Sequence, residues 1–392
     1  MSNLSEYDLV VIGKPVINDG EKRYMGADYW EHLSGMSNHF RSLNLLCREV
    51  PLNDRDRTSL SEIDTAEVSF HTNTSWNGAV STFGKVTGTL RSLRNLHERR
   101  HRNTITYLFL PGMYPFLLMP AAVSVSDVSL AHFGSEAVGR AAAVYGDSIP
   151  GRLKTLFYQY AQEYALNYID VITTLDGSLL GRNAAADLRL SKPFADVTPV
   201  DPLPDLDSDL GTPVKLLYVA SFRPYKGHKH LIDAVDSLTS STDRDFELCL
   251  VGDGPKRSEI ETYAESLGHG DCVRFTGYVS DKELVREYEN ADIFIMPSLD
   301  EGGPQVVLEA AFIGLPIIST EVGLVRSVFT DDVDVLKIEK SSPKAIEEAI
   351  RELARNRSLR ETIASNARES VQWFAEGNPT DQCLEILRSK IG

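Results

Sequence analysis

The sequence of 392 residues is poor in cysteine, and the positions of its cysteines exclude the usual cysteine-based sites. Cys47, Cys249, Cys272 and Cys383 are far apart and form neither the close pairs of a zinc or redox motif nor a disulfide framework. We therefore expect free thiols in a reducing compartment.

Long apolar runs are also missing. No run approaches the ~18 residues that a membrane-spanning helix requires. Residues 1–8 are polar and acidic, whereas a secretion signal is basic and then apolar. Together these features predict a cytoplasmic protein without a transmembrane segment.

The chain has no excess of positive charge. It has 40 basic and 56 acidic residues, and the formal net charge of −16 argues against binding to nucleic acid and to anionic membranes in general. A local exception is residues 83–102, where apolar residues at helical spacing accompany five arginines. This segment predicts either an amphipathic helix with a solvated basic face or a peripheral surface that docks a lipid-linked molecule.

The length suits two domains of nearly 200 residues each. From residue 214 onward, short β-branched runs alternate with helical patterns, which predicts a parallel sheet wrapped by helices. The first half begins with a buried-strand run at residues 7–12 and also reads as α/β. Between the halves, residues 197–213 contain four prolines and four acids and predict a linker.

The remaining strands are predicted from the same kind of run. They are residues 104–110, 128–132 and 169–173 in the first half, and 215–219, 247–251, 272–275, 293–296 and 316–319 in the second. Ser280 and Glu283 have the spacing of a capping box at the start of a helix.

The most informative feature is a pair of carboxylates, Glu301 and Glu309, eight residues apart after strand 293–296. Between them, Pro304 suits the first position of a helix, and the glycines at 302 and 303 let a ligand approach the backbone. The free amides of such a helix start can receive a phosphate.

Each glutamate also has a purely structural interpretation. Glu301 can complement the helix dipole, and Glu309 can be a partly exposed helical residue. Glu309 nevertheless stands in an otherwise apolar run, where a charge usually has a partner or a function.

Residues 291–319 closely resemble the donor-site signature of the retaining glycosyltransferases of family four. The resemblance is strong over residues 214–319 and general over the first 195. It implies the GT-B fold, in which two Rossmann-like, doubly wound α/β domains face each other across a cleft. It also implies that Glu301 lies near the donor sugar and that Glu309 binds the ribose hydroxyls of the nucleotide.

This fold sets the expected domain boundaries. Residues 1–196 are the N-terminal, acceptor-side domain and residues 197–213 the linker. Residues 214–371 are the C-terminal domain, which binds the nucleotide sugar. Residues 372–392 are expected to form a helix that crosses back to the first domain.

Arg223 and Lys226 lie in the turn after strand 215–219, where two cations can neutralise a diphosphate leaving group. A solvated basic turn is the structural alternative. The resembled family commonly has a Gly-Arg pair five residues before the lysine, where this chain has Ala220 and Ser221. We therefore expect Arg223 to substitute from an offset position.

Two further loops of the second half have candidate donor contacts. Gly252 lies in a strand-turn-helix junction near the nucleotide of the family, although glycine is also common in ordinary turns. Tyr278 and Val279 correspond to the segment that holds the base, with core packing as the alternative for the tyrosine.

In the first half, His132 ends strand 128–132, where the family has a functional histidine or its equivalent against the donor sugar. A buried structural histidine is the alternative. Gly13 follows the first strand, where relatives have a glycine-rich loop at the pyrophosphate and acceptor side, and an ordinary turn is its alternative.

The resemblance thus implies a retaining, metal-independent hexosyltransferase. It would use a UDP- or GDP-linked sugar, with no cofactor, and a hydroxyl of a glycan, lipid or small metabolite as acceptor. The predicted catalytic residues are Glu301, His132, Lys226 and Arg223. The predicted donor-binding residues are Glu309, Gly302, Gly303, Pro304, Gly252, Tyr278, Val279 and Gly13.

Two other function classes stay open. A nucleotide-sugar epimerase of GT-B shape could use a similar two-domain cleft. The resembled family commonly has two adjacent glycines and a later glutamate where this chain has Leu324 and Ser327. The altered positions Ser221 and Leu324 favour the alternative of a nucleotide-sugar-binding sensor or inactive partner subunit. Binding without turnover would distinguish the sensor.

Overall fold

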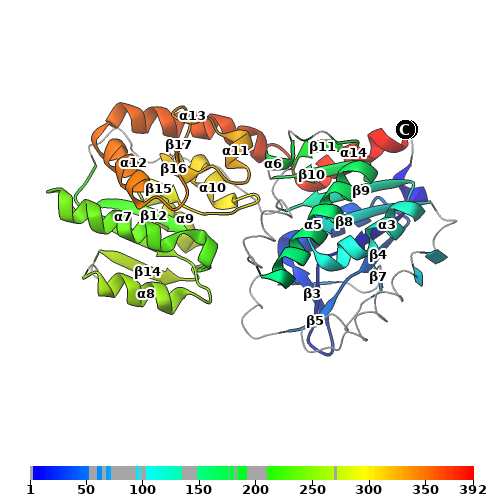
Figure 1. The fold of residues 1–392 in the computed structure, drawn as a ribbon. Helices are drawn as coiled ribbons and strands as arrows, with labels where there is room; N and C mark the ends of the chain where they lie inside the picture. The colour runs from blue at the N-terminus through cyan, green and yellow to red at the C-terminus, as the bar shows by residue number, and fades with distance from the viewer. Residues whose placement is uncertain are drawn as a thin grey trace. The chain divides into compact units, whose positions relative to one another are not determined.

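The computed structural model describes residues 3–52, 60–63, 68–71, 94–95, 97–98, 103–134, 148–175, 177–180, 182, 184–191, 210–268 and 272–392. The chain divides into two compact units (Figure 1). The first comprises Met1–Leu175, Leu179–Ala195 and Gly377–Gly392, and the second Asp176–Ser178 and Asp196–Glu376.

The main sheet of the first unit is parallel, in the order β11-β10-β9-β8-β1-β4-β7. Its strands are β1 (Asp8–Ile12), β4 (Ser42–Leu46), β7 (Val68–Phe70), β8 (Thr104–Leu110), β9 (Val128–Phe133), β10 (Val171–Thr174) and β11 (Asp187–Leu190). The chain order reverses between β1 and β8, and ligands of open α/β sheets bind at such a switch point. A small sheet has the order β5 (Glu49–Pro51), β2 (Val16–Asn18), β3 (Arg23–Gly26), β6 (Leu60–Glu62).

Helices from both ends of the sequence complete this unit. They are η1 (Leu4–Glu6), α1 (Ala27–Ser37), α3 (Met113–Val125), α5 (Ile149–Tyr168) and α14 (Pro379–Ile391). The residues of the short helix α6 (Gly177–Leu180), which follows β10, are divided between the two units. The apolar face of α14, which includes Leu384 and Leu387, is buried in the same core as Leu9 and Val11 of β1. Thr380 Oγ1 of α14 lies 2.9 Å from His32 Nδ1 of α1.

The second unit has a six-stranded parallel sheet in the order β14-β13-β12-β15-β16-β17. Its strands are β12 (Val214–Val219), β13 (Phe246–Val251), β14 (Val273–Gly277), β15 (Ile293–Met296), β16 (Ile317–Thr320) and β17 (Leu336–Ile338). This is the Rossmann strand order, with its switch point between β12 and β15.

Helices cover both faces of this sheet. They are η4 (Pro224–Lys226), α7 (His228–Ser241), α8 (Arg257–Ser266), α9 (Asp281–Glu289), α10 (Gln305–Ile313), α11 (Val325–Val328), α12 (Pro343–Arg355) and α13 (Arg357–Ala375). Helix α7 contacts α8 and α12, whereas α10 contacts α9 and α13 (Figure 1). The capping box of Ser280 and Glu283 is confirmed, because each side chain binds the backbone of the other residue.

The predicted doubly wound α/β architecture is therefore confirmed in both units. Strands β8 and β15 have the predicted bounds, and Pro304 is the N-cap of α10, one position earlier than predicted. Its extended backbone (ψ 95°) is not helical, although its carbonyl accepts from Val307 N at 3.1 Å. Most of the basic segment 83–102 and of the linker 197–213 lies outside the described residues. Within the described ranges, no helix has the length and apolarity to cross a membrane.

Candidate functional site

Two loops meet at the switch point of the second unit: residues 220–227 after β12 and residues 297–304 after β15. Leu299 N donates a 2.7 Å hydrogen bond to the carbonyl of Tyr225. Gly227 has a φ of +74°, and a Cβ atom there would lie 2.2 Å from the carbonyl oxygen of Pro297. Only glycine permits this approach, so the backbone itself holds the loops together.

This approach brings Lys226 and Glu301 into an ion pair between Nζ and Oε1, with side chains only 15% and 13% exposed. Ser298 Oγ donates to the same Oε1 at 2.8 Å. Beneath them, the buried hydroxyl of Tyr218 donates to the carbonyl of Lys226 at 2.7 Å and lies 2.9 Å from Ser298 Oγ. Neutral hydroxyls therefore orient the Glu301 carboxylate and the backbone of Lys226, and such hydrogen bonds support a partly buried ion pair.

The second carboxylate, Glu309, lies in α10 and accepts a 2.7 Å hydrogen bond from the hydroxyl of Tyr288. Burial raises the pKa of Glu309, and the bond from Tyr288 partly offsets this rise. At the start of the same helix, Pro304 has no side-chain cap for the first-turn amides. The helix thus combines a held carboxylate with an N-terminus able to receive an anion.

The loop after β16 supports the turn at Gly302. Leu324 N donates a 2.9 Å hydrogen bond to the carbonyl of Gly302. Gly323 has a φ of +51°, and a Cβ atom on it would lie 1.9 Å from the same oxygen. Leu324, one of the departures from the family pattern, is fully buried in this position.

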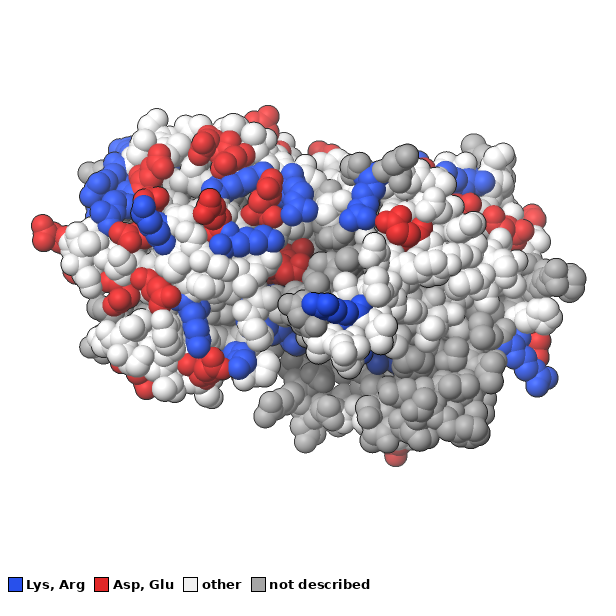
Figure 2. Space-filling view, viewed as in Figure 1, with Lys and Arg blue, Asp and Glu red and all other residues white. Residues whose placement is uncertain are grey.

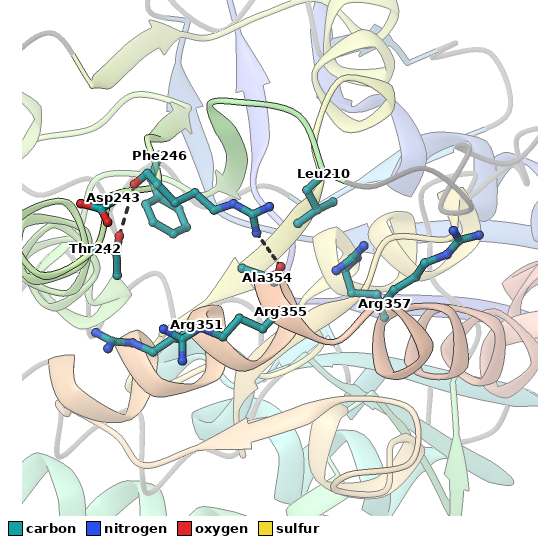
Figure 3. Close-up of a pocket in the computed structure, with 10 residues that line it drawn as sticks. Leu210, Thr242, Asp243, Phe246, Arg351, Ala354, Arg355 and Arg357 are labelled. Atoms are coloured by element: carbon teal, nitrogen blue, oxygen red, sulfur yellow. Dashed lines mark hydrogen bonds between the residues drawn. The ribbon is translucent and has the colours of Figure 1, made fainter.

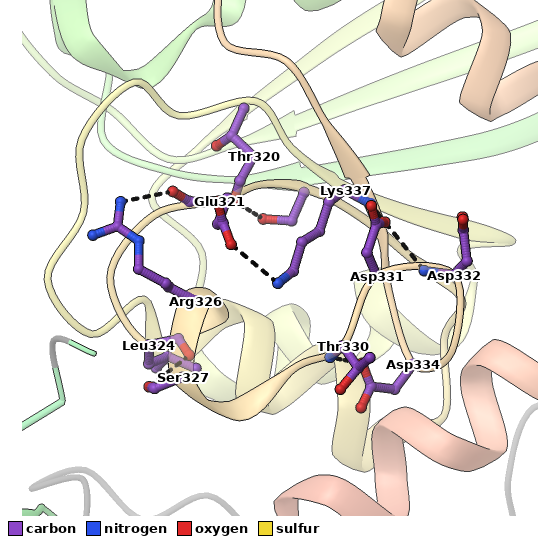
Figure 4. A network of polar contacts seen from close by, with 11 residues as sticks. Thr320, Glu321, Leu324, Arg326, Ser327, Thr330, Asp331, Asp332, Asp334 and Lys337 are labelled. Carbon is purple, nitrogen blue, oxygen red and sulfur yellow. Dashed lines mark hydrogen bonds and ion pairs between the residues drawn. The ribbon is translucent and has the colours of Figure 1, made fainter. Parts of the chain in front are cut away.

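The loop after β16 is itself held by a network of polar contacts (Figure 4). The carboxylate of Glu321 lies 3.4 Å from Lys337 Nζ, and its carbonyl accepts from Arg326 at 3.3 Å. The backbone N–H of Lys337 donates to Asp331 at 2.7 Å. Ser327, the other departure, donates its hydroxyl to the carbonyl of Leu324 at 3.1 Å (Figure 4).

The other predicted residues of this unit lie in the loops that follow β12, β13 and β14, and their environments differ. Arg223 is exposed at the start of η4. Gly252 has a φ of +129°, and a Cβ atom would lie 2.2 Å from the carbonyl of Ala220, so a structural need explains this glycine. Tyr278 is 79% exposed, which rules out core packing, and Val279 is partly exposed.

In the first unit, a cavity of about 530 Å³ opens at the switch point, among loops that follow β1, β4, β8 and β9. It contains two predicted residues, Gly13 and His132. His132 is 4% exposed, and its Nδ1 lies 3.3 Å from Thr173 Oγ1. Burial, assisted by the charge of Lys14, lowers the pKa of His132 to about 3, so its ring is neutral at physiological pH.

Gly13 has a φ of +133°, and a Cβ atom would lie 2.7 Å from the carbonyl oxygen of Phe109. The turn after β1 therefore depends on glycine. The ten remaining predicted residues all belong to the second unit.

Sequence reasoning missed the residues that orient this machinery: Tyr218, Ser298 and Tyr288. In the sequence, Tyr218 and Tyr288 cannot be distinguished from aromatic residues that only pack in the core. Ser298 follows strand 293–296 directly, and its position at the carboxyl end of a central strand is a signal that could have identified it.

A second cavity, of about 590 Å³, has five arginines in its lining (Figure 3). Most are engaged within the fold: Arg244 and Arg360 donate to the carbonyls of Ala354 and Leu353 at 2.6 and 2.8 Å, at the end of α12. Arg351 pairs with Glu347 and Arg357 with Glu361. Capping of the helix C-terminus accounts for Arg244 and Arg360, and ion pairs within helices account for Arg351 and Arg357.

The surface around α7, α12 and α13 has mixed charge. Figure 2 shows Lys and Arg interspersed with Asp and Glu over this part of the molecule. Among the residues that the structure describes, no group of three or more His, Cys, Asp and Glu side chains could hold a metal ion.

Comparison with known proteins supports the sequence resemblance over the second unit. Residues 208–370 match the family model described as Glycosyl transferases group 1. The chain is 32% identical over 161 residues to the uncharacterized glycosyltransferase MJ1178 of Methanocaldococcus jannaschii, which covers 41% of this chain and 43% of that protein. The chain spans about half the length of the curated relatives it matches.

Solved structures match over both units. Sucrose-phosphate synthase from Thermosynechococcus elongatus superposes with a TM-score of 0.68 at 16% identity, covering 98% of each chain. HepE of Anabaena, in complex with UDP and glucose, gives a TM-score of 0.64 at 14% identity, covering 98% of this chain and 100% of that one. These matches confirm the predicted GT-B fold, and the match to the glycosyl transferases group 1 model lies in the second unit.

Proposed function

We propose that this chain, with its glycosyl transferases group 1 domain, is a retaining glycosyltransferase that moves a hexosyl group from a nucleoside diphosphate sugar to a hydroxyl. UDP- and GDP-linked sugars are the proposed donors, and a glycan, lipid or small metabolite is the acceptor. The observation that carries the proposal is the Lys226–Glu301 pair beside the start of α10, at the switch point of the Rossmann-like sheet.

The chemistry follows from the charge that develops as the sugar leaves. When the bond between the anomeric carbon and the phosphate oxygen breaks, negative charge accumulates on the diphosphate. Lys226 has three N–H donors, of which Glu301 engages one, so the others are available to a phosphate oxygen. Arg223 and the first-turn amides of α10 add to this stabilisation. Because these groups neutralise the negative charge of the leaving diphosphate, we propose that the reaction does not need a metal ion.

The two carboxylates have different tasks in this proposal. Lys226 and Ser298 both contact Oε1 of Glu301, and we assign Oε2 to hydroxyls of the donor sugar. Tyr288 contacts Oε2 of Glu309, and we assign Oε1 to the ribose hydroxyls. Neutral His132 of the first unit is assigned to the sugar as well.

The remaining assignments are donor contacts. Gly302 and Gly303 let the diphosphate approach the backbone. Exposed Tyr278 is available to the base, together with Val279. HepE, which has the same fold, binds UDP and glucose, which favours UDP as the first nucleotide to test. A cytoplasmic location fits the four free cysteines.

The test is release of nucleoside diphosphate from a panel of UDP-, GDP- and ADP-sugars, with and without an acceptor library. We expect the wild type to release one nucleoside diphosphate. The rate of this release should fall at least ~100-fold in Lys226→Ala, which is the usual cost of removing a hydrogen-bond donor that stabilises the charge of a transition state. Glu309→Ala should raise the donor KM. Lys229→Ala is the matched control, because Lys229 pairs with Glu259 on the surface.

Product analysis completes the test. Retention of the anomeric configuration is read by NMR of the product, and activity in EDTA tests metal independence. Donor binding without turnover for any acceptor would indicate a sensor, and conversion of the donor sugar to its epimer would indicate an epimerase. Either result would overturn the proposal.

A further inference from the structure

We infer that the acceptor carries a phosphate, and that Lys14 and Arg48 bind this phosphate in the cavity of the first unit. This inference rests on the proposed transferase function and specifies its second substrate as a sugar or polyol phosphate. It concerns two residues outside the predicted site and a cavity that lies within one unit.

The charge of the cavity is the first argument. Lys14 and Arg48 both line it, and among the described lining residues none is Asp or Glu. The chain as a whole has 56 acidic residues against 40 basic ones. Two cations with no acid among the described lining residues give this part of the cavity a positive potential, which favours an anionic ligand.

The position of Lys14 is the second argument. Its Nζ lies 3.4 Å from the centroid of the Tyr29 ring, a cation–π contact that holds the ammonium at the cavity wall. Tyr29 itself packs edge-to-face against Phe109, with 5.6 Å between ring centroids. The ammonium is therefore positioned on rigid aromatic groups, and its charge is also felt by buried His132.

The backbone adds a third source of positive potential. Helix α3 has 13 residues and begins at Met113, which lines the cavity, as does its N-cap Gly112. Gly112 has no side chain to cap the first-turn amides. The positive end of the helix dipole therefore acts on the same cavity as the two cations.

The walls and the volume indicate what the phosphate is attached to. Tyr29, Phe109, Tyr114 and Tyr158 line the cavity, and its volume of about 530 Å³ is in the range of small-molecule sites. Aromatic faces suit the C–H face of a sugar or polyol ring, while the cations suit its charged end. We assign this phosphate to the acceptor because the second unit supplies Lys226, Arg223 and the start of α10 for the donor diphosphate.

Calorimetry tests this assignment. The titrants are hexose 6-phosphates, hexose 1-phosphates, inositol 1-phosphate and glycerol 3-phosphate, each against its dephosphorylated counterpart, with inorganic phosphate and UDP in parallel. We expect at least one phosphate ester to bind ten times or more tightly than its counterpart. Lys14→Met and Arg48→Met should each weaken it about tenfold or more, as expected for loss of a charge-assisted hydrogen bond.

Matched variants separate charge from folding. Lys14→Arg and Arg48→Lys should retain part of the affinity, and Arg355→Gln, on the exposed side of the second unit, should retain all of it. Thermal unfolding of each variant checks the fold. The inference is overturned if no phosphate ester is preferred, if neither Met variant weakens binding, or if Lys14→Met weakens UDP binding instead.

The two proposals fail in different ways. Wild-type release of nucleoside diphosphate without any preference for phosphorylated acceptors would sink only the acceptor assignment. Tight binding of a phosphate ester without nucleotide release from any donor would sink the transferase function.

Discussion

The hydroxyl of Tyr288 donates a 2.7 Å hydrogen bond to Oε2 of Glu309, from one helix of the second unit to the next. Tyr288 is 1% exposed, and its hydroxyl also lies 3.2 Å from the carbonyl of Val306. Burial raises the pKa of Glu309, and this bond opposes the rise. Tyr288 therefore favours the ionised carboxylate that we assign to the ribose hydroxyls.

Removal of this hydroxyl should weaken donor binding. In Tyr288→Phe, Glu309 keeps its burial and loses a donor, so we expect the free energy of unfolding to fall by about 1–3 kcal/mol at neutral pH. The donor KM should rise several-fold, measured by nucleotide release. Tyr263→Phe is the control, since its hydroxyl contacts Asp233. An unchanged donor KM in Tyr288→Phe would contradict the assignment.

Glu309→Gln should change how stability depends on pH. The carboxyl pKa is raised above its ordinary value of 4.5, so the folded protein holds this proton more tightly than the unfolded chain. The resulting stabilisation is complete below pH 4.5 and is lost as the pH rises through the folded pKa. Glutamine does not titrate, so the melting temperature of the variant relative to wild type should increase from pH 4 to pH 8. A difference that is constant across this range would disprove the stated cause.

Ser298→Ala should reduce catalysis more than it reduces folding. The serine hydroxyl donates to Glu301 at 2.8 Å and adjoins Tyr218, so its loss frees the carboxylate to rotate away from the sugar. We expect kcat/KM to fall about tenfold, the scale of one lost hydrogen bond to a charged group. Ser327→Ala, which removes a hydroxyl bound to a backbone carbonyl, is the comparison. Equal activity of the two variants would rule out the positioning role of Ser298.

Gly323→Ala should distort the donor loop. Its Cβ atom would collide with the carbonyl of Gly302 at 1.9 Å, and its φ of +51° is unfavourable for alanine. We expect a loss of more than about 1 kcal/mol in stability and a higher donor KM. Gly268→Ala separates the two causes, because Gly268 has a φ of +80° with nothing within 4 Å of its Cβ position. If both variants raise the donor KM equally, backbone strain and not the collision is responsible.

Much of this architecture could be predicted from local pattern. Alternating β-branched runs and helical periodicity predicted two doubly wound sheets, and strands β8 and β15 have the predicted ends. The capping box of Ser280 and the glycine-proline turn before α10 are also local, since each depends on residues a few positions apart. Glu301 and Lys226 were identified separately, each in a loop after a strand.

The contacts between those loops were decided only by the tertiary structure. The Lys226–Glu301 pair joins residues 75 positions apart, and the hydroxyls of Tyr218 and Ser298 meet across 80. Such contacts depend on the strand order, which puts β12 beside β15 although two strands separate them in the chain. The same reason applies to Lys14 and Arg48, which line one cavity because β1 lies beside β4 in a parallel sheet. Local sequence determines which side chains end each strand, and the packing of strands determines which of them share a site.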